Sequence, residues 1–144
     1  MLKKEPWMRQ SSKWLNHIYL YRLPVIVLCL FIFWQSSYPS MISTSLFPHE
    51  DKVLHFGAWA LLAFLCARSL FAEKPFWPVG RIKLIVIVFA CLFGLSDEIH
   101  QAFVSSRSAS AGDFAADCAG SVFGCFFYLK AFMHKKIDEP GSKA

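Results

Sequence analysis

The stretch Ser96-Asp97-Glu98-Ile99-His100-Gln101 follows directly on an apolar run from Leu84 to Leu95. Lys83 is the last charged residue before it, so a helix through this region carries carboxyl, imidazole, hydroxyl and amide groups to membrane depth. Ionisable side chains at that depth are costly and usually mark a functional site. The stretch therefore predicts a membrane-spanning helix with a polar site at one end.

The composition of the chain indicates a small polytopic membrane protein. Of its 144 residues, 56% are hydrophobic, and the mean hydropathy is +0.41. Its length fits one domain. The net charge is +5, but basic residues cluster at the ends of apolar runs and no nucleic-acid-binding motif is present, so we expect no nucleic acid partner. All five cysteines lie inside apolar runs, where free cysteine usually packs as a small apolar residue.

Four apolar runs divide the chain, at 23–34, 51–68, 82–104 and from Asp113 to Lys130. They predict three regions: a basic cytoplasmic or interfacial segment 1–22, a membrane domain 23–136 and a polar tail 137–144. A cleaved signal peptide is disfavoured, because no small-x-small cleavage site follows the first run.

The distribution of basic residues predicts the orientation of these runs. Thirteen of the 15 lysines and arginines fall in the N-terminal segment, the connection 68–83 or the C-terminal end, and only Lys52 and Arg107 fall between them. Cytoplasmic segments carry such an excess of lysine and arginine. We therefore expect an all-α membrane protein of about four transmembrane helices packed as a small bundle, N-in and C-in, in the cell inner (cytoplasmic) membrane.

Three of these runs place polar groups at a similar depth on the outer side. A spanning helix needs about 20 residues. Counting that length from the basic ends of the runs puts Asp97 and His100 near the outer boundary, Asp51 and His55 one to two turns inside, and Asp117 about two turns deep.

Helical spacing indicates that these groups share faces. Three pairs lie four residues apart, which places their members on one helix face. These pairs are Asp51 and His55, Asp97 and Gln101, and Asp113 and Asp117. Ala116, Gly120 and Gly124 form a small-xxx-small pattern, which allows close helix packing within the chain or between chains of a homo-oligomer.

Two interpretations of the polar groups remain open at the level of sequence. They form either an internal network that pins the helix ends, or a cavity that binds or transforms a ligand. The candidate ligand-binding residues are Asp51, Lys52, His55, Ser96, Gln101, Arg107, Asp113 and Asp117. A divalent metal is a candidate cofactor, with His55, Asp97, His100 and Asp117 as candidate ligands. Arg107 either binds an anionic group or neutralises the acids.

The motifs resemble those of the VanZ-like membrane protein family. The matching stretches are Asp51-Lys52-x-x-His55-Phe56, Ser96 to Gln101 with Phe103, and Arg107-Ser108-Ala109-Ser110 followed by Asp113 and the small-residue helix. The resemblance covers residues 50–126. It implies an envelope membrane protein of unsettled biochemical activity, in a family whose namesake is associated with susceptibility to the glycopeptide teicoplanin.

A second resemblance concerns Ser106-Arg107-x5-Asp113-x3-Asp117, which has the spacing of the last motif of lipid-phosphate phosphatases. Asp113 stands where those enzymes have their histidine nucleophile, and their other two motifs are missing from this sequence. A phosphohistidine mechanism is therefore unsupported, while an anion pocket at Arg107 remains open.

Three function classes follow. The first is a VanZ-like protein whose outward-facing acidic site binds or acts on an envelope component, with the bilayer and a lipid-linked or anionic ligand as partners. The second is a membrane-embedded hydrolase or transferase with a carboxylate/His centre. Its candidate catalytic residues are His55, Asp97, Glu98 and His100. The third is a small proton-coupled transporter, which four helices accommodate less readily.

Overall fold

The computed structural model describes residues 15–38, 49–105 and 107–133, and every regular element in these ranges is helical. The four α-helices are α2 (Leu23–Ser36), α3 (Glu50–Glu73), α4 (Val79–Gln101) and α5 (Ala111–Tyr128). Two π-helical turns, η1 (Ile18–Arg22) and η2 (Leu129–Met133), precede α2 and continue α5. The prediction of an all-α chain is confirmed. Most of the expected segment 1–22 and all of the expected tail 137–144 lie outside the described residues.

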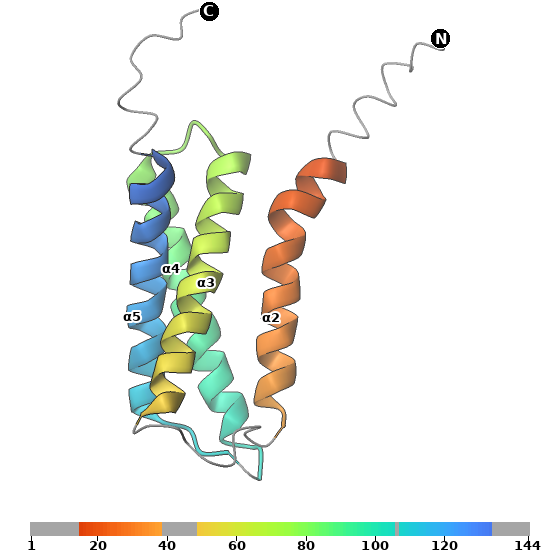
Figure 1. The fold of residues 1–144 in the computed structure, drawn as a ribbon, viewed down its shortest axis with the longest axis vertical. Coiled ribbons are helices and arrows are strands. Elements are labelled where there is room, and N and C mark those ends of the chain that lie inside the picture. The colour runs from red at the N-terminus through yellow and green to blue at the C-terminus, as the bar shows by residue number, and fades with distance from the viewer. Residues whose placement is uncertain (1–14, 39–48, 106, 134–144) are drawn as a thin grey trace, which may run out of the picture.

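Successive helices run in opposite directions, and α3, α4 and α5 form a three-helix bundle with α2 beside it (Figure 1). Helix α3 packs most extensively against α5. Within the described ranges, three helices are long and apolar enough to cross a membrane, with bounds Leu15–Ser36, Glu50–Glu73 and Val79–Ala102. We call the end of the bundle where α3 begins, α4 ends and α5 begins the acidic end.

The helices differ from the predicted runs for local reasons. Helix α3 continues past Arg68 to Glu73, because nothing breaks it until Pro75, whose ring disfavours helical backbone at Lys74. Helix α4 starts at Val79 after Pro78 and ends at Gln101, three residues before the expected Val104. Helix α5 begins earlier than Asp113, because the Ser110 hydroxyl caps it by accepting the Gly112 N–H at 3.2 Å.

In the described residues the first helical segment runs from Leu15 to Ser36, whereas the first apolar run begins only at Leu23. Pro24 has no N–H to donate one turn back, which leaves the Leu20 carbonyl without its usual helical donor. A guanidinium nitrogen of Arg68 on α3 donates to that carbonyl at 3.0 Å. The π-helical turn Ile18–Arg22 lies at this point, as expected where the helical ladder is interrupted.

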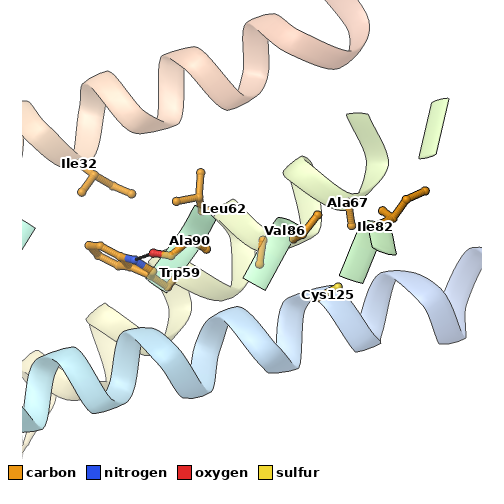
Figure 2. Close-up of a cluster of buried hydrophobic side chains, with 9 residues drawn as sticks. Ile32, Trp59, Leu62, Ala67, Ile82, Val86, Ala90 and Cys125 are labelled. Carbon is orange, nitrogen blue, oxygen red and sulfur yellow. Dashed lines mark hydrogen bonds between the residues drawn. The ribbon is translucent and has the colours of Figure 1, made fainter. Parts of the chain in front are cut away.

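The apolar core is a narrow stripe between α3, α4 and α5, with one residue from α2 (Figure 2). On α4 the buried positions Ile82, Val86, Ala90 and Gly94 recur every four residues. The same stripe continues into Asp97, Glu98 and Gln101 at the acidic end. The face of α4 that carries the core therefore also carries the polar side chains inward.

Most large apolar side chains of α2 and α4 point away from this core. Phe31, Leu84 and Leu92 are more than half exposed, and many neighbours on the same helix faces are exposed to a similar degree. An apolar surface of this extent is expected where helices contact lipid.

Candidate functional site

Five carboxyl groups are buried at the acidic end of the bundle, one of which is Glu50 at the start of α3. Asp97 and Glu98 come from α4, and Asp113 and Asp117 come from α5; each is less than one-tenth exposed, and Asp117 is fully buried. Buried carboxyl groups need partners, because removal from water penalises the ionised form. The four carboxyl groups on α4 and α5 belong to one ion pair, one hydrogen-bonded pair and one central cluster.

The central cluster consists of His55, Glu98 and Asp117, which come from three different helices. His55 Nδ1 lies 2.9 Å from Asp117 Oδ1 and 4.0 Å from Glu98 Oε1. One ligand atom from each of the three residues lies within 4.8 Å of the others. Glu98 Oε1 and Asp117 Oδ2 have no hydrogen-bond partner among the described residues. The cluster is thus the part of the site whose polar groups are least satisfied.

Neighbouring groups fix the orientation of the cluster. The Ser110 N–H, at the start of α5, donates to Glu98 Oε2 at 2.7 Å. The imidazole of His55 stacks on Trp59, with ring centroids 5.5 Å apart, and Trp59 Nε1 donates to the Ala90 carbonyl at 3.0 Å (Figure 2). These contacts hold Glu98 and His55 in place without using Glu98 Oε1.

Gly94 lets the cluster and Trp59 lie close to α4. A Cβ atom at this position would lie 2.9 Å from both Asp117 Oδ2 and Trp59 Nε1. Real Cβ atoms do not approach other atoms so closely, so a larger residue here would displace one of the two side chains.

Asp113 and Asp97, the other buried carboxyl groups of α5 and α4, have partners of their own. Lys52 Nζ on α3 donates to Asp113 Oδ1 at 2.9 Å and to the exposed Asp51 Oδ2 at 3.1 Å. Gln101 Nε2 donates to Asp97 Oδ2 at 2.8 Å, one turn along α4. Of the three pairs that helical spacing placed on common faces, Asp97 and Gln101 are hydrogen-bonded to each other. The members of the other two pairs have separate partners, and Asp51 is exposed.

His100 and Ser96 lie apart from the cluster. His100 Nε2 is 3.0 Å from the Ser37 hydroxyl, and its ring packs on Phe33 of α2, with ring centroids 4.8 Å apart. Ser96 is exposed, and its hydroxyl donates to the Phe93 carbonyl of its own helix. Neither residue belongs to the cluster of His55, Glu98 and Asp117. Of the four metal ligands that the sequence suggested, only His55 and Asp117 therefore lie together in this cluster.

Arg107 caps the end of α2. Its Nε and Nη2 atoms donate to the carbonyls of Tyr38 and Gln35 at 2.9 and 3.0 Å. The last carbonyls of a helix have no intrahelical donors, and an arginine is a suitable partner for them. The sequence suggested an anion partner or an acid partner for Arg107, and no acid pairs with it in the described part of the chain.

A cavity of about 310 Å³ opens between α2 and the bundle, and we call it the α2 cavity. Its polar lining gathers the candidate site residues Asp51, His55, Asp97 and Arg107 together with Gln35 and Ser36. Its apolar lining comes from α2 and α3, through Leu28, Phe31, Ile32, Leu54, Ala58 and Trp59. The cavity is therefore amphipathic, and His55 belongs both to its wall and to the cluster.

Sequence reasoning did not single out Trp59, Ser110 or Gln35 as site residues. Trp59 follows Asp51 and His55 at the same four-residue spacing, so the helical face could have indicated it. Ser110 and Gln35 enter through a backbone N–H and a backbone carbonyl, for which the sequence offers no side-chain signal.

The helical architecture, the three membrane-length apolar helices and the buried polar cluster define the class of the chain, which is a helical membrane protein. The chain belongs to the VanZ/LLP1 family, whose model matches residues 18–133. This match confirms the resemblance expected from the motifs and extends it beyond residues 50–126 to include α2. No curated protein and no solved structure matches the chain significantly.

Proposed function

We propose that this VanZ-like protein is a multi-pass protein of the inner membrane, with four crossings, both ends in the cytoplasm and the acidic end facing outward. The distribution of lysine and arginine supports this orientation, since 13 of 15 lie in segments assigned to the cytoplasm. Helix α5 is not among the three helices that are long and apolar enough to cross a membrane, but it packs along α3. Contacts extend from Lys52–Asp113 at the acidic end to Phe71–Tyr128 toward the other end. If α3 crosses the membrane, α5 crosses with it.

The proposed function is binding of an amphipathic envelope component in the α2 cavity. The observation that carries this proposal is the division of the cavity lining into an apolar part and a polar end. Such a lining matches a lipid-linked molecule whose chain lies against Leu28 and Ile32 and whose head group meets Arg107. Arg107 Nε and Nη2 are used on carbonyls, which leaves Nη1 available for a phosphate-bearing head group.

A second cavity of about 300 Å³ supports lateral access along α2. It lies on the same side of the bundle, toward the opposite end, and is lined by Val25, Leu70, Val86 and neighbouring side chains. Between the cavities, α2 contacts the bundle through apolar side chains such as Leu28 and Cys29, whereas polar contacts fasten both of its ends. At one end Arg22 pairs with Glu73, and at the other Arg107 caps the helix. A lipid chain can therefore enter between α2 and the bundle.

The proposal is tested by lipids that copurify with the protein, identified by native mass spectrometry in detergent. Ala58→Phe fills the apolar part of the α2 cavity and should reduce bound lipid at least tenfold. The matched control is Ala119→Phe, on an exposed position of α5, which should retain lipid at the wild-type level. Equal lipid occupancy in a folded Ala58→Phe variant would refute binding in this cavity.

A second candidate function is hydrolysis or group transfer on the bound lipid. The observation that favours it is the His55–Asp117 pair, because a carboxylate that orients a histidine is a recurrent general-base arrangement and His55 lines the cavity. Release of inorganic phosphate from vesicles that contain a lipid phosphate measures this activity. His55→Gln should abolish it, whereas His100→Gln should leave most of it. No phosphate release by the wild-type protein above the His55→Gln background would exclude this function for that substrate.

A further inference from the structure

The cluster of His55, Glu98 and Asp117 has more buried negative charge than nearby cations compensate. Glu98 is 5% exposed and Asp117 is fully buried. Lys52 is committed to Asp113 and Asp51, and Arg107 to two backbone carbonyls. Among the described residues, no lysine or arginine pairs with either cluster carboxylate.

Two oxygen atoms of this cluster are buried without partners. Glu98 Oε1 and Asp117 Oδ2 accept no hydrogen bond from the described part of the chain. Buried polar atoms without a partner are rare, and an ion is one of the groups that satisfies them. Glu98 Oε1 faces the imidazole nitrogen of His55 at 4.0 Å. The orphaned oxygen thus points toward the other donors of the cluster.

We propose that His55, Glu98 and Asp117 bind one divalent transition-metal ion, zinc or manganese. A dication would balance two carboxylates with a neutral imidazole. The donor set of one nitrogen and two carboxylate oxygens suits these ions, whereas calcium prefers six to eight oxygen ligands. Three protein ligands also leave a coordination position open, as in catalytic rather than structural zinc sites.

The geometry requires only small movements of the three side chains. In a tetrahedral site with metal–ligand bonds of about 2.1 Å, two ligand atoms lie about 3.4 Å apart. The three ligand atoms lie within 4.8 Å of one another, and His55 Nδ1 already lies 2.9 and 4.0 Å from one oxygen of each carboxylate. Contraction of the widest separation by about 1.4 Å therefore completes the site. His55 would carry its proton on Nε2 and bind through Nδ1.

Each proposed ligand also has the outer contacts that metal ligands usually have. Ser110 holds Glu98 through its other carboxylate oxygen, and Trp59 holds the imidazole plane of His55. Asp117 is fixed by its complete burial between α3 and α4, where Gly94 provides room for its second oxygen. The cluster is therefore preorganised rather than dependent on exposed, mobile side chains.

This site differs from the metal site that the sequence suggested. Asp97 is hydrogen-bonded to Gln101, and His100 contacts α2, so neither belongs to the three-residue set. Glu98, the neighbour of Asp97, takes its place. The difference gives a matched pair of variants, because Glu98→Gln and Asp97→Asn both neutralise a buried carboxylate at adjacent positions of α4.

The test is the metal content of the full-length protein in detergent, stripped of metal and then loaded with zinc or manganese alone. Inductively coupled plasma mass spectrometry should find about one ion per wild-type chain. Glu98→Gln, Asp117→Asn and His55→Gln should each lower this ratio at least about tenfold, a loss of the size that even outer-contact mutations can cause. Asp97→Asn and the exposed Asp51→Asn should keep it.

Two measurements keep this proposal falsifiable where a variant does not fold. Wild-type protein loaded with cobalt should show ligand-field absorption, and added zinc should raise its melting temperature. The proposal is overturned if the wild-type protein binds neither zinc nor manganese in a stoichiometric amount. It is also overturned if a folded Asp97→Asn variant loses the ion to the same degree as Glu98→Gln does. No lipid is added in this assay, and the metal content is measured directly, so its outcome is distinguishable from that of the lipid-binding test.

Discussion

At the scale of single residues, Gly94 determines how closely Trp59 and Asp117 approach α4. Gly94→Ala places a methyl group 2.9 Å from an oxygen of Asp117 and from the indole nitrogen of Trp59. We expect a loss of about 1–3 kcal/mol in the free energy of unfolding, because neither buried side chain has room to move. Thermal or denaturant unfolding in detergent measures this change.

Gly57 provides the control for Gly94. It lies in the interior of α3, and a Cβ atom there meets nothing within 4 Å. Gly57→Ala should therefore stabilise the protein by up to about 1 kcal/mol through helix propensity alone. Equal effects of the two substitutions would show that Gly94 is not a packing position.

The ion pair between Lys52 and Asp113 joins the first turns of α3 and α5. Lys52→Met leaves the nearly buried carboxylate of Asp113 without its cation, so it should lower the melting temperature by several degrees. Asp113→Asn in the Lys52→Met background should recover part of the loss. A double-mutant cycle measures the coupling, and strictly additive effects would contradict the pair. Asp51→Asn, at the exposed partner of Lys52, should have little effect.

At the scale of helices, two glycines of α5 let its backbone lie close to that of α3. A Cβ atom at Gly120 would overlap the Phe56 carbonyl, and one at Gly124 would overlap the Ala60 carbonyl. The small-residue pattern of the sequence thus serves a contact within the chain, as small-xxx-small faces of membrane helices often do. A homo-oligomer through Gly120 and Gly124 would need this contact to open.

Substitution on the two faces of α5 tests this packing. Gly124→Ala should destabilise the protein by about 3 kcal/mol, because two helix backbones must separate to admit one methyl group. Ala119→Leu adds more volume on an exposed position of α5 and should change stability by less than about 0.5 kcal/mol. Melting temperatures of the two variants in one detergent give the comparison. A tolerated Gly124→Ala would mean that α3 and α5 are not in close contact.

At the scale of the whole molecule, the two connections near the ends of α4 lie on opposite sides of the proposed membrane. Phe76 lies in the connection between α3 and α4, and Phe103 follows the end of α4; both side chains are more than four-fifths exposed. In a cysteine-free background, Phe103→Cys should react with a membrane-impermeant maleimide in intact cells. Phe76→Cys should react only after the membrane is permeabilised.

The labelling result decides the orientation independently of any activity. Labelling of Phe76→Cys alone in intact cells would invert the proposed topology, and labelling of both positions would contradict a crossing by α4. The native cysteines lie on membrane-length helices or on α5 and form no disulfide, so their replacement by serine or alanine should leave the fold intact.

The sequence by itself determined the helical class, the approximate runs, the family and the end of the molecule at which the polar groups gather. These properties depend on local composition: a long apolar run predicts a spanning helix, and spacings of four residues place Asp113 with Asp117 and Asp97 with Gln101 on common faces. The start of the first helix was less predictable. The first apolar run begins at Leu23, whereas Arg68 supports the helix around Pro24 from a distant position in the chain.

Only the tertiary structure decided which polar groups meet. Adjacent residues on a helix point about 100° apart, so the rotation of α4 determines whether Asp97 or Glu98 reaches His55. That rotation is set by packing of Ile82, Val86, Ala90 and Gly94 against α3 and α5, and it directs Glu98 to the cluster and His100 to α2. Arg107 likewise follows the position of the end of α2 rather than the charge of nearby acids. Local sequence determines the depth of a side chain, whereas its partners depend on contacts between helices that are distant in the chain.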